Sequence, residues 1–137
     1  ALLIARVHDE RLMFEKQGAV WNFPAAKRGH VDIRLRVRGA GVRVCLTDRW
    51  YNACDETVGD FAPVRFDIGD VERDRWIDAR IDYDETTARL SLNGAPVAEA
   101  PLRCPAPYGL CYVHIQTLAE EEDFAGTLIK ALSMAAD

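Results

Sequence analysis

The stretch from Asp48 to Phe61, DRWYNACDETVGDF, gathers side-chain types that bind sugars. Trp50 and Tyr51 are adjacent aromatic residues, and an aromatic ring presents a flat apolar face on which a pyranose can stack. Asn52 and Asp55 add polar groups that hydrogen-bond to sugar hydroxyls. We therefore expect a carbohydrate-binding surface here. In the alternative, the two aromatic rings close the end of the core and the acids are simply solvated.

The same stretch also offers oxygen ligands for a metal ion. Asp48, Asn52 and Asp55 carry the carboxylate and amide oxygens that Ca²⁺, a hard cation, prefers. Their spacing, D-x-x-x-N-x-x-D, is wider than that of an EF-hand loop. We expect no cofactor, with calcium at these three residues as the alternative.

Four cysteines allow several arrangements: Cys45, Cys54, Cys104 and Cys111. They can remain free thiols, or they can form the local disulfides Cys45–Cys54 and Cys104–Cys111. The second pair encloses the turn-forming sequence CPAPYGLC. Zinc is the weakest alternative, because no C-x-x-C pair is present and the three histidines are scattered. The compartment stays open, with an extracytoplasmic location favoured.

Catalytic patterns are weak in this sequence. A jelly-roll glycosidase needs two carboxylates about 5–9.5 Å apart across a cleft. Asp78, Asp82 and Asp84 share a strand parity, but Arg80 lies between them and no Glu accompanies them. The acid run 120–123 is typical of a solvated loop. No Ser–His–Asp arrangement, phosphate loop or H-E-x-x-H motif is present, so the sequence favours a chain without catalytic residues.

The totals predict a single globular domain over residues 1–137. Apolar residues make up 49% of the chain and charged residues 28%, and this length suits one domain. The net charge of −5 argues against a nucleic-acid partner. No apolar run approaches the ~20 residues of a membrane span, so we expect no membrane partner. Because the chain starts at Ala1, we expect a processed protein or a module of a longer one.

The dominant pattern is the two-residue period of β-strands. Apolar residues alternate with polar ones through 31–37, and the alternation resumes at 42–46 after Gly39-Ala40-Gly41. We interpret the two runs as a hairpin. Its wet face then carries four arginines: Arg34, Arg36, Arg38 and Arg43. They could bind an acidic partner, but we favour ion pairs across strands with Asp32, Asp78 and Asp82.

Further strands follow from the same pattern. Runs at 76–83 and 88–92 alternate, and Asn93-Gly94 predicts a type I′ turn that leads into the next strand. Weaker strands are expected at 2–7, 12–15, 19–23, 64–68 and 110–116. Within the last of these, Tyr112, His114 and Gln116 share one face and form a candidate row of ligand contacts. We interpret the closing segment GTLIKALSMAA as a strand rather than a helix.

Two segments resemble concanavalin A-like and laminin-G-like jelly rolls. The first is the hairpin WIDARIDYDETTARLSLNGAPVAEA, with Trp76, Tyr83 and Asn93-Gly94 at the matching positions. The second is DFAGTLIKALSM, which is similar to the closing strand through Phe124, Gly126 and Leu128, although Lys130 stands where an acid is usual. The resemblance and the strand pattern predict an all-β fold, an antiparallel two-sheet β-sandwich of the jelly-roll, concanavalin A-like kind.

Fold alone does not assign a reaction, and this superfamily includes lectins, carbohydrate-binding modules, endoglucanases and adhesion modules. We expect a non-catalytic, lectin-like module with carbohydrate as its partner, as an accessory part of a glycan-active enzyme. One alternative is a structural or interaction module that packs on a neighbouring domain or subunit. A weaker one is a glycoside hydrolase or lyase.

Overall fold

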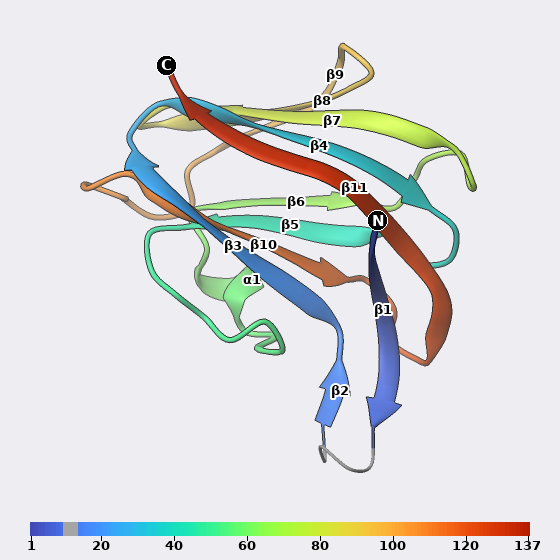
Figure 1. The fold of residues 1–137 in the computed structure, drawn as a ribbon. Helices are drawn as coiled ribbons and strands as arrows, with labels where there is room; N and C mark the ends of the chain where they lie inside the picture. Colours follow the sequence, from blue (N-terminus) through green and yellow to red (C-terminus); the bar gives the residue numbers. More distant parts are fainter. Residues whose placement is uncertain (10–13) are drawn as a thin grey trace.

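The computed structural model describes residues 1–9 and 14–137, and in this part of the chain almost all regular structure is β-strand (Figure 1). The strands and one short helix have these bounds: β1 Leu2–Asp9, β2 Phe14–Lys16, β3 Gly18–Ala26, β4 Gly29–Val37, β5 Val42–Thr47, α1 Val58–Phe61, β6 Val64–Ile68, β7 Trp76–Tyr83, β8 Thr87–Leu92, β9 Ala95–Pro101, β10 Leu110–Thr117 and β11 Asp123–Ala136. The predicted strand 12–15 lies partly outside the described residues.

The strands form two sheets that lie face to face (Figure 1). The seven-stranded sheet has the order β2-β1-β11-β4-β7-β8-β9, and the four-stranded sheet has the order β3-β10-β5-β6. Each pair of neighbouring strands runs antiparallel. The prediction of an all-β, antiparallel two-sheet sandwich is confirmed, and the closing segment is a strand. No helix of the described residues is long and apolar enough to cross a membrane.

The core lies between the sheets and consists of the alternate side chains that point inward from the strands. On β4 the buried residues are Val31, Ile33, Leu35 and Val37, each at most 2% exposed. They belong to one apolar cluster with residues of the facing sheet, such as Leu46 and Ile115. Burying these side chains provides the main driving force for folding.

The predicted hairpin of residues 31–46 is wrong, because β4 and β5 belong to different sheets. The connection between them crosses from one sheet to the other. The N–H groups of Arg38 and Gly39 donate to the carbonyl oxygen of Gly126 at 2.9 Å each, which ties the crossing to β11. Gly41 passes so close to β6 that an added Cβ would lie 2.0 Å from the carbonyl oxygen of Ile68. The spacing of apolar residues alone does not distinguish such a crossing from a hairpin.

One of the expected ion pairs, Arg34 with Asp78, forms on the outer face of the seven-stranded sheet, whereas Arg36 pairs with Asp74 at 2.7 Å. Arg34 lies 3.1 Å from Asp78, and Arg80 lies 3.7 Å from Asp32 and 3.2 Å from Asp82. Arg43 is on the other sheet, where it pairs with Asp67 at 3.0 Å. Such exposed pairs contribute little stability individually, but they offset the repulsion among the arginines.

The hairpin of β7 and β8 and the turn into β9 agree with the sequence. Asn93 and Gly94 have φ angles of 50° and 82°, the left-handed conformation that a type I′ turn requires. The Asn93 side-chain oxygen also accepts a hydrogen bond from the N–H of Asp78 at 2.9 Å. The turn therefore fixes the register of the predicted strands.

Candidate functional site

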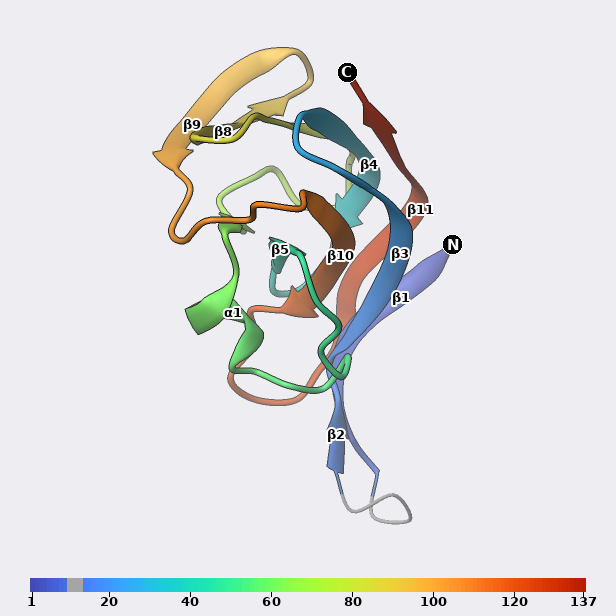
Figure 2. The ribbon, with the colours of Figure 1, turned by 90° about the vertical axis from the view of Figure 1, so that its left-hand side faces the viewer.

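The connection between β5 and β6, residues 48–63, folds back over the outer face of the four-stranded sheet (Figure 2). We call it the covering loop. Its helix α1 packs Val58, and the following Ala62, against Cys45 of β5, with Tyr51 alongside. Cys45, Val58 and Ala62 are each at most 1% exposed. The quoted stretch is therefore a packed cover rather than a loop that extends into solvent.

Strand register places the outer side chains of this sheet in three rows across the strands. The first row contains Asn22, Tyr112 and Thr47, from β3, β10 and β5. The second continues to β6 and contains Val20, His114, Cys45 and Arg65. The third contains Gly18, Gln116, Arg43 and Asp67. Tyr112, His114 and Gln116 thus share one face, as their parity predicted, and each lies in a different row.

His114 lies beneath the covering loop and is 1% exposed. Its Nε2 is 3.1 Å from the Thr47 hydroxyl oxygen, whose own hydrogen is donated to the carbonyl oxygen of Arg49 at 2.7 Å. The hydroxyl must then accept from Nε2–H, which places the proton on Nε2 and leaves Nδ1 without a hydrogen-bond partner. Burial lowers the pKa of His114 to about 4, although the nearby carboxylate of Asp55 opposes the shift. The ring is therefore neutral at pH 7.

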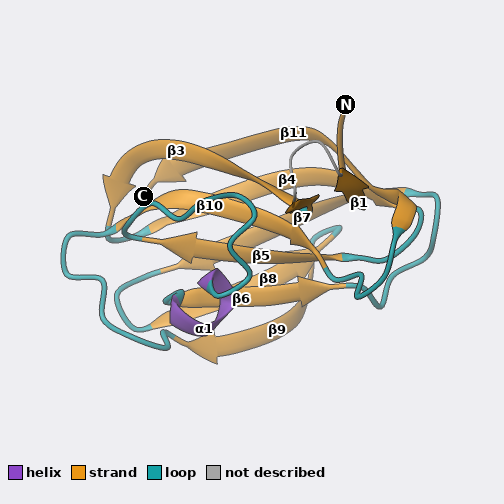
Figure 3. Cartoon of the chain, turned by 90° about the horizontal axis from the view of Figure 1, so that it is seen from below, coloured by secondary structure: helices purple, strands orange, loops and turns teal. Residues whose placement is uncertain are grey.

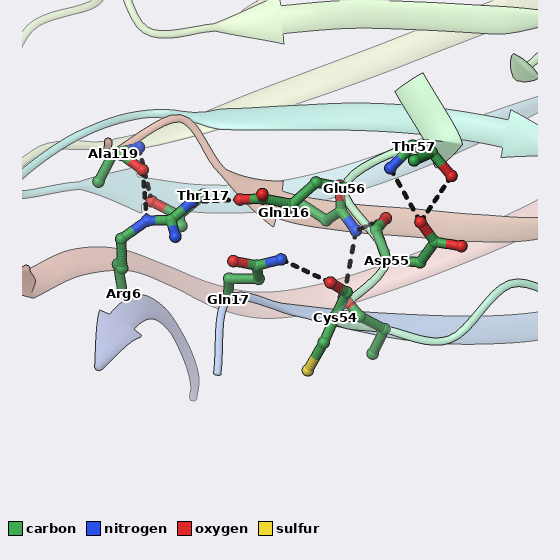
Figure 4. Close-up of polar contacts among 10 residues, drawn as sticks. Arg6, Gln17, Cys54, Asp55, Glu56, Thr57, Gln116, Thr117 and Ala119 are labelled. Atoms are coloured by element: carbon green, nitrogen blue, oxygen red, sulfur yellow. Dashed lines mark hydrogen bonds and ion pairs between the residues drawn. The ribbon is translucent and has the colours of Figure 1, made fainter. Parts of the chain in front are cut away.

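Gln116 holds the covering loop to the sheet (Figure 4). Its side-chain amide donates to the carbonyl oxygens of Ala53 at 3.1 Å and Asp55 at 2.7 Å. Gln17, at the start of the adjacent strand, donates in the same way to the carbonyl oxygen of Cys54 at 2.6 Å. Gln116 is only 5% exposed. His114 and Gln116 thus support the loop instead of lying free for a ligand, which revises the expected contact row.

The polar residues of the loop are engaged in local turns. The side-chain oxygen of Asn52 accepts from the N–H of Cys54 at 2.9 Å, and Asp55 accepts from the N–H and hydroxyl of Thr57 at 2.9 and 2.6 Å. The Thr57 bonds hold the pKa of Asp55 below its usual value. Asp48 instead pairs with Arg49 at 3.1 Å. These separate partners do not favour a shared calcium ion, and the described residues contain no cluster of three His, Cys, Asp or Glu that could hold a metal.

The exposed part of the predicted site combines residues of the covering loop with residues of the first row. Trp50 is 62% exposed, although indole is among the most apolar of side chains. Tyr51 and Tyr112 are half-buried, and each ring packs near His114, with centroid distances of 5.8 and 6.3 Å. Asn22 is exposed beside Tyr112. We call these four residues, Trp50, Tyr51, Tyr112 and Asn22, the aromatic edge.

Asn22 was not expected in the site, because only the pairing of β3 with β10 brings it beside Tyr112. Nothing in the local sequence around Asn22 indicates this neighbour. The structure therefore joins part of the quoted stretch to one residue of the expected row and adds a residue from a third strand.

A hollow lies at the third row of the sheet, beside the covering loop. It has a volume of about 270 Å³ and is lined by polar side chains that include Arg6, Arg43 and Glu56. Arg6 reaches Glu56 at 2.5 Å and the carbonyl oxygen of Ala119 at 2.5 Å (Figure 4). Arg6 thereby ties the covering loop to β1 and to the segment after β10.

All four cysteines are free thiols in the structure, so of the two open arrangements the disulfides Cys45–Cys54 and Cys104–Cys111 are not the one observed. Cys45 is covered by α1, and burial raises the pKa of its thiol to about 12. The Cys104 thiol donates instead to the carbonyl oxygen of Phe61 at 3.5 Å. The alternative of free thiols describes the structure.

No protein-family model matches this sequence, and no curated protein matches it. Solved structures do match in fold. Sheep galectin-11 in complex with glycerol superposes with a TM-score of 0.64 at 9% identity, covering 88% of this chain and 98% of the galectin. A toad ovary galectin in complex with thio-digalactose gives 0.57 at 13% identity, covering 88% and 99%.

A sialidase also matches, with a TM-score of 0.60 at 10% identity. The match covers 87% of this chain but only 14% of the sialidase, so it concerns one part of a much larger protein. At these identities the likeness concerns the fold. The chain has a galectin-like fold, in agreement with the concanavalin A-like jelly roll that the sequence predicted.

Proposed function

We propose that this chain is a non-catalytic, lectin-like module that binds carbohydrate at the aromatic edge. The observation that carries the proposal is the exposure of Trp50, which is 62% accessible and is followed in the chain by the half-buried Tyr51. Exposing an indole ring to water is unfavourable, and a flat apolar ring bordered by polar groups suits the apolar face of a pyranose. The structural neighbours include galectins in complex with glycerol and thio-digalactose.

Each residue of the aromatic edge has a distinct role in this proposal. The indole of Trp50 stacks on the sugar ring, while the Tyr112 hydroxyl and the Asn22 amide exchange hydrogen bonds with sugar hydroxyls. The adjacent ion pair of Asp48 and Arg49 supplies charged acceptors and donors that form the stronger kind of hydrogen bond. His114 does not touch the sugar and instead supports Tyr51 from below.

The module is best suited to act as an accessory part of a glycan-active enzyme. A domain of this fold occurs within a sialidase that is several times longer than this chain. The aromatic edge supplies stacking and hydrogen bonding, while two carboxylates of the same loop are engaged, Asp48 with Arg49 and Asp55 with Thr57. We therefore assign binding of the glycan to this chain, and the chemical reaction on the glycan to another domain or subunit.

A second candidate is an interaction module, and one surface favours it. Leu2, Leu3 and Phe124, on the paired strands β1 and β11, are 44%, 43% and 64% exposed. Exposed apolar residues on neighbouring strands can pack on another protein, and this part of the surface is where such a module would dock. Such packing on a neighbouring domain is compatible with sugar binding at the opposite sheet.

A glycan-array screen tests the proposed function. The folded protein is applied with Ca²⁺ and again with a chelator, because calcium at Asp48, Asn52 and Asp55 remains the alternative to a metal-free site. We expect selective binding to a small set of glycans that is unchanged by the chelator. Selective binding lost in chelator would assign a metal to the site. A flat array under both conditions would reject the lectin function and favour the interaction module.

A further inference from the structure

The two sheets have unequal widths, and one edge of the larger sheet has no strand opposite it. The four-stranded sheet ends at β6, whereas the seven-stranded sheet ends at β9. Seen from the side of the smaller sheet, β9 lies beyond β6 (Figure 3). Ala98 of β9 pairs with Leu90, so both face the core side, yet Leu90 is 3% exposed while Ala98 is exposed. The inner face of β9 is therefore uncovered at Ala98, although Ala100 of the same face packs against the core.

An open hollow of about 460 Å³ occupies this place. It is lined by Arg65, Phe66, Asp67, Ala98 and Arg103. The segment that follows β9 closes only one end of it, where the N–H of Arg103 donates to the carbonyl oxygen of Pro63 at 2.9 Å. The floor is apolar because Phe66 and Ala98 face inward, and the rim is polar.

The strand that borders the hollow has an unprotected edge. β6 pairs with β5 along all five of its residues without a bulge, so its other edge presents alternate N–H and carbonyl groups. Proline within an edge strand is a common protection against further pairing. β9 contains Pro96 and Pro101 and β3 contains Pro24, whereas β6, with the sequence VRFDI, contains none.

The charge beside this edge is positive. The carboxylate of Asp67 is already 3.0 Å from Arg43, and Arg65 lies 3.9 Å from the same carboxylate. Arg103 donates to the backbone carbonyl oxygens of Gly59 and Asp60 rather than to a carboxylate. Two guanidinium groups at the rim, Arg65 and Arg103, are thus incompletely neutralised and favour an acidic partner.

We infer that the free edge of β6 binds one extended segment of another protein, which adds a fifth strand to the smaller sheet. Its apolar side chains cover Phe66 and Ala98, and its alternate side chains are acidic and contact Arg65 and Arg103. Backbone hydrogen bonds to β6 supply affinity, as in other complexes formed by strand addition. A second copy of this chain does not fit, since strands must approach to about 4.8 Å and the β9 strands of both copies would overlap there.

The test uses a fluorescently labelled peptide of eight residues that alternates valine and glutamate, with a valine–lysine peptide as the control. We expect the glutamate peptide to bind, as measured by fluorescence anisotropy, and the lysine peptide to bind at least about tenfold more weakly. In NMR spectra of the protein, the shifted amides should be those of 64–68 and of β9. Equal binding of both peptides, or shifts confined to other strands, would overturn the inference.

Charge reversal at the rim sharpens the test. Arg65→Glu and Arg103→Glu should each weaken binding of the glutamate peptide about tenfold and favour the lysine peptide. Arg28→Glu reverses an exposed charge on the segment between β3 and β4, away from the hollow, and should leave binding unchanged. Because Arg65 and Arg103 both donate to the Gly59 carbonyl oxygen of α1, circular dichroism confirms that each variant folds. Ala98→Lys provides a further variant that blocks the hollow from β9. Unchanged binding in the folded rim variants, or dimers through β6 in sedimentation, would refute the proposed partner.

Discussion

The ring of His114 lies 5.8 Å from the ring of Tyr51 and nearly perpendicular to it, at 72°. One residue belongs to the middle of the four-stranded sheet and the other to the covering loop. The contact joins His114, in the second row of the sheet, to the aromatic edge. The position of Tyr51, and with it that of the adjacent Trp50, thus depends on a neutral, buried histidine.

The buried state of His114 predicts a loss of stability in acid. Its pKa is about 4 in the folded chain, against about 6.5 for an ordinary histidine, so between these values the unfolded chain binds a proton that the folded chain does not. The free energy of unfolding should therefore fall as the pH decreases from 6.5 to 4, by up to about 3 kcal/mol. Urea denaturation at pH 7 and pH 4.5 measures this change.

The variant His114→Gln, which cannot titrate, should remove most of this dependence on pH. His30→Gln, at a histidine on the other sheet, should retain it. Equal losses in wild type and His114→Gln would show that other groups cause the acid sensitivity. Asp55 and Asp84 have pKa values lowered below the usual carboxyl range, so their contribution is lost mainly below pH 4.

Removal of the Gln116 side chain should loosen the covering loop. Gln116→Ala removes the amide that donates to the carbonyl oxygens of Ala53 and Asp55, which should lower the free energy of unfolding by about 1–3 kcal/mol. Hydrogen exchange of the amides in 52–57 should accelerate, while exchange in β4 and β7 stays slow. Asn22→Ala removes an exposed amide from the neighbouring strand and should change neither quantity appreciably. Unchanged exchange in 52–57 would mean that Gln116 does not hold the loop.

Thiol chemistry should distinguish the cysteines. The denatured, unreduced protein should react with four equivalents of a thiol reagent, whereas two disulfides would leave none. In the folded protein at pH 8, iodoacetamide should modify Cys54 and Cys104 well before Cys45, whose thiol is buried and has a pKa of about 12. Mass spectrometry of peptides gives each rate. Modification of Cys45 should accelerate in Gln116→Ala, because the loop covers that thiol.

Much of the fold follows from local patterns in the sequence. The alternation in 76–83 and 88–92 and the Asn93-Gly94 turn determine their own pairing, because short connections leave few alternatives. The run 31–37 is likewise a strand with the predicted inward face. The step from β4 to β5 was missed, since the short segment between them resembles a hairpin loop while crossing between sheets.

The site was predictable only in part, for a physical reason. The residue types in 48–61 indicate where polar and aromatic groups gather, and parity places Tyr112, His114 and Gln116 on one face. Whether that face is open depends on a chain segment folding back over it, and this depends on long-range contacts such as Gln116 with Asp55. Because of this packing, His114 and Gln116, which were expected to contact a ligand, support the loop instead.

Binding at the aromatic edge is the central claim, and titration calorimetry with the strongest glycan from the array tests it most directly. Wild type is compared with Trp50→Ala and with Phe124→Ala, which removes an aromatic side chain of similar exposure, 64% against 62%, from the other sheet. The account predicts that Trp50→Ala weakens binding at least about fivefold, as losses of about 1–3 kcal/mol for aromatic side chains stacked on nucleic-acid bases imply, and that Phe124→Ala does not. Unchanged affinity in folded Trp50→Ala would contradict it.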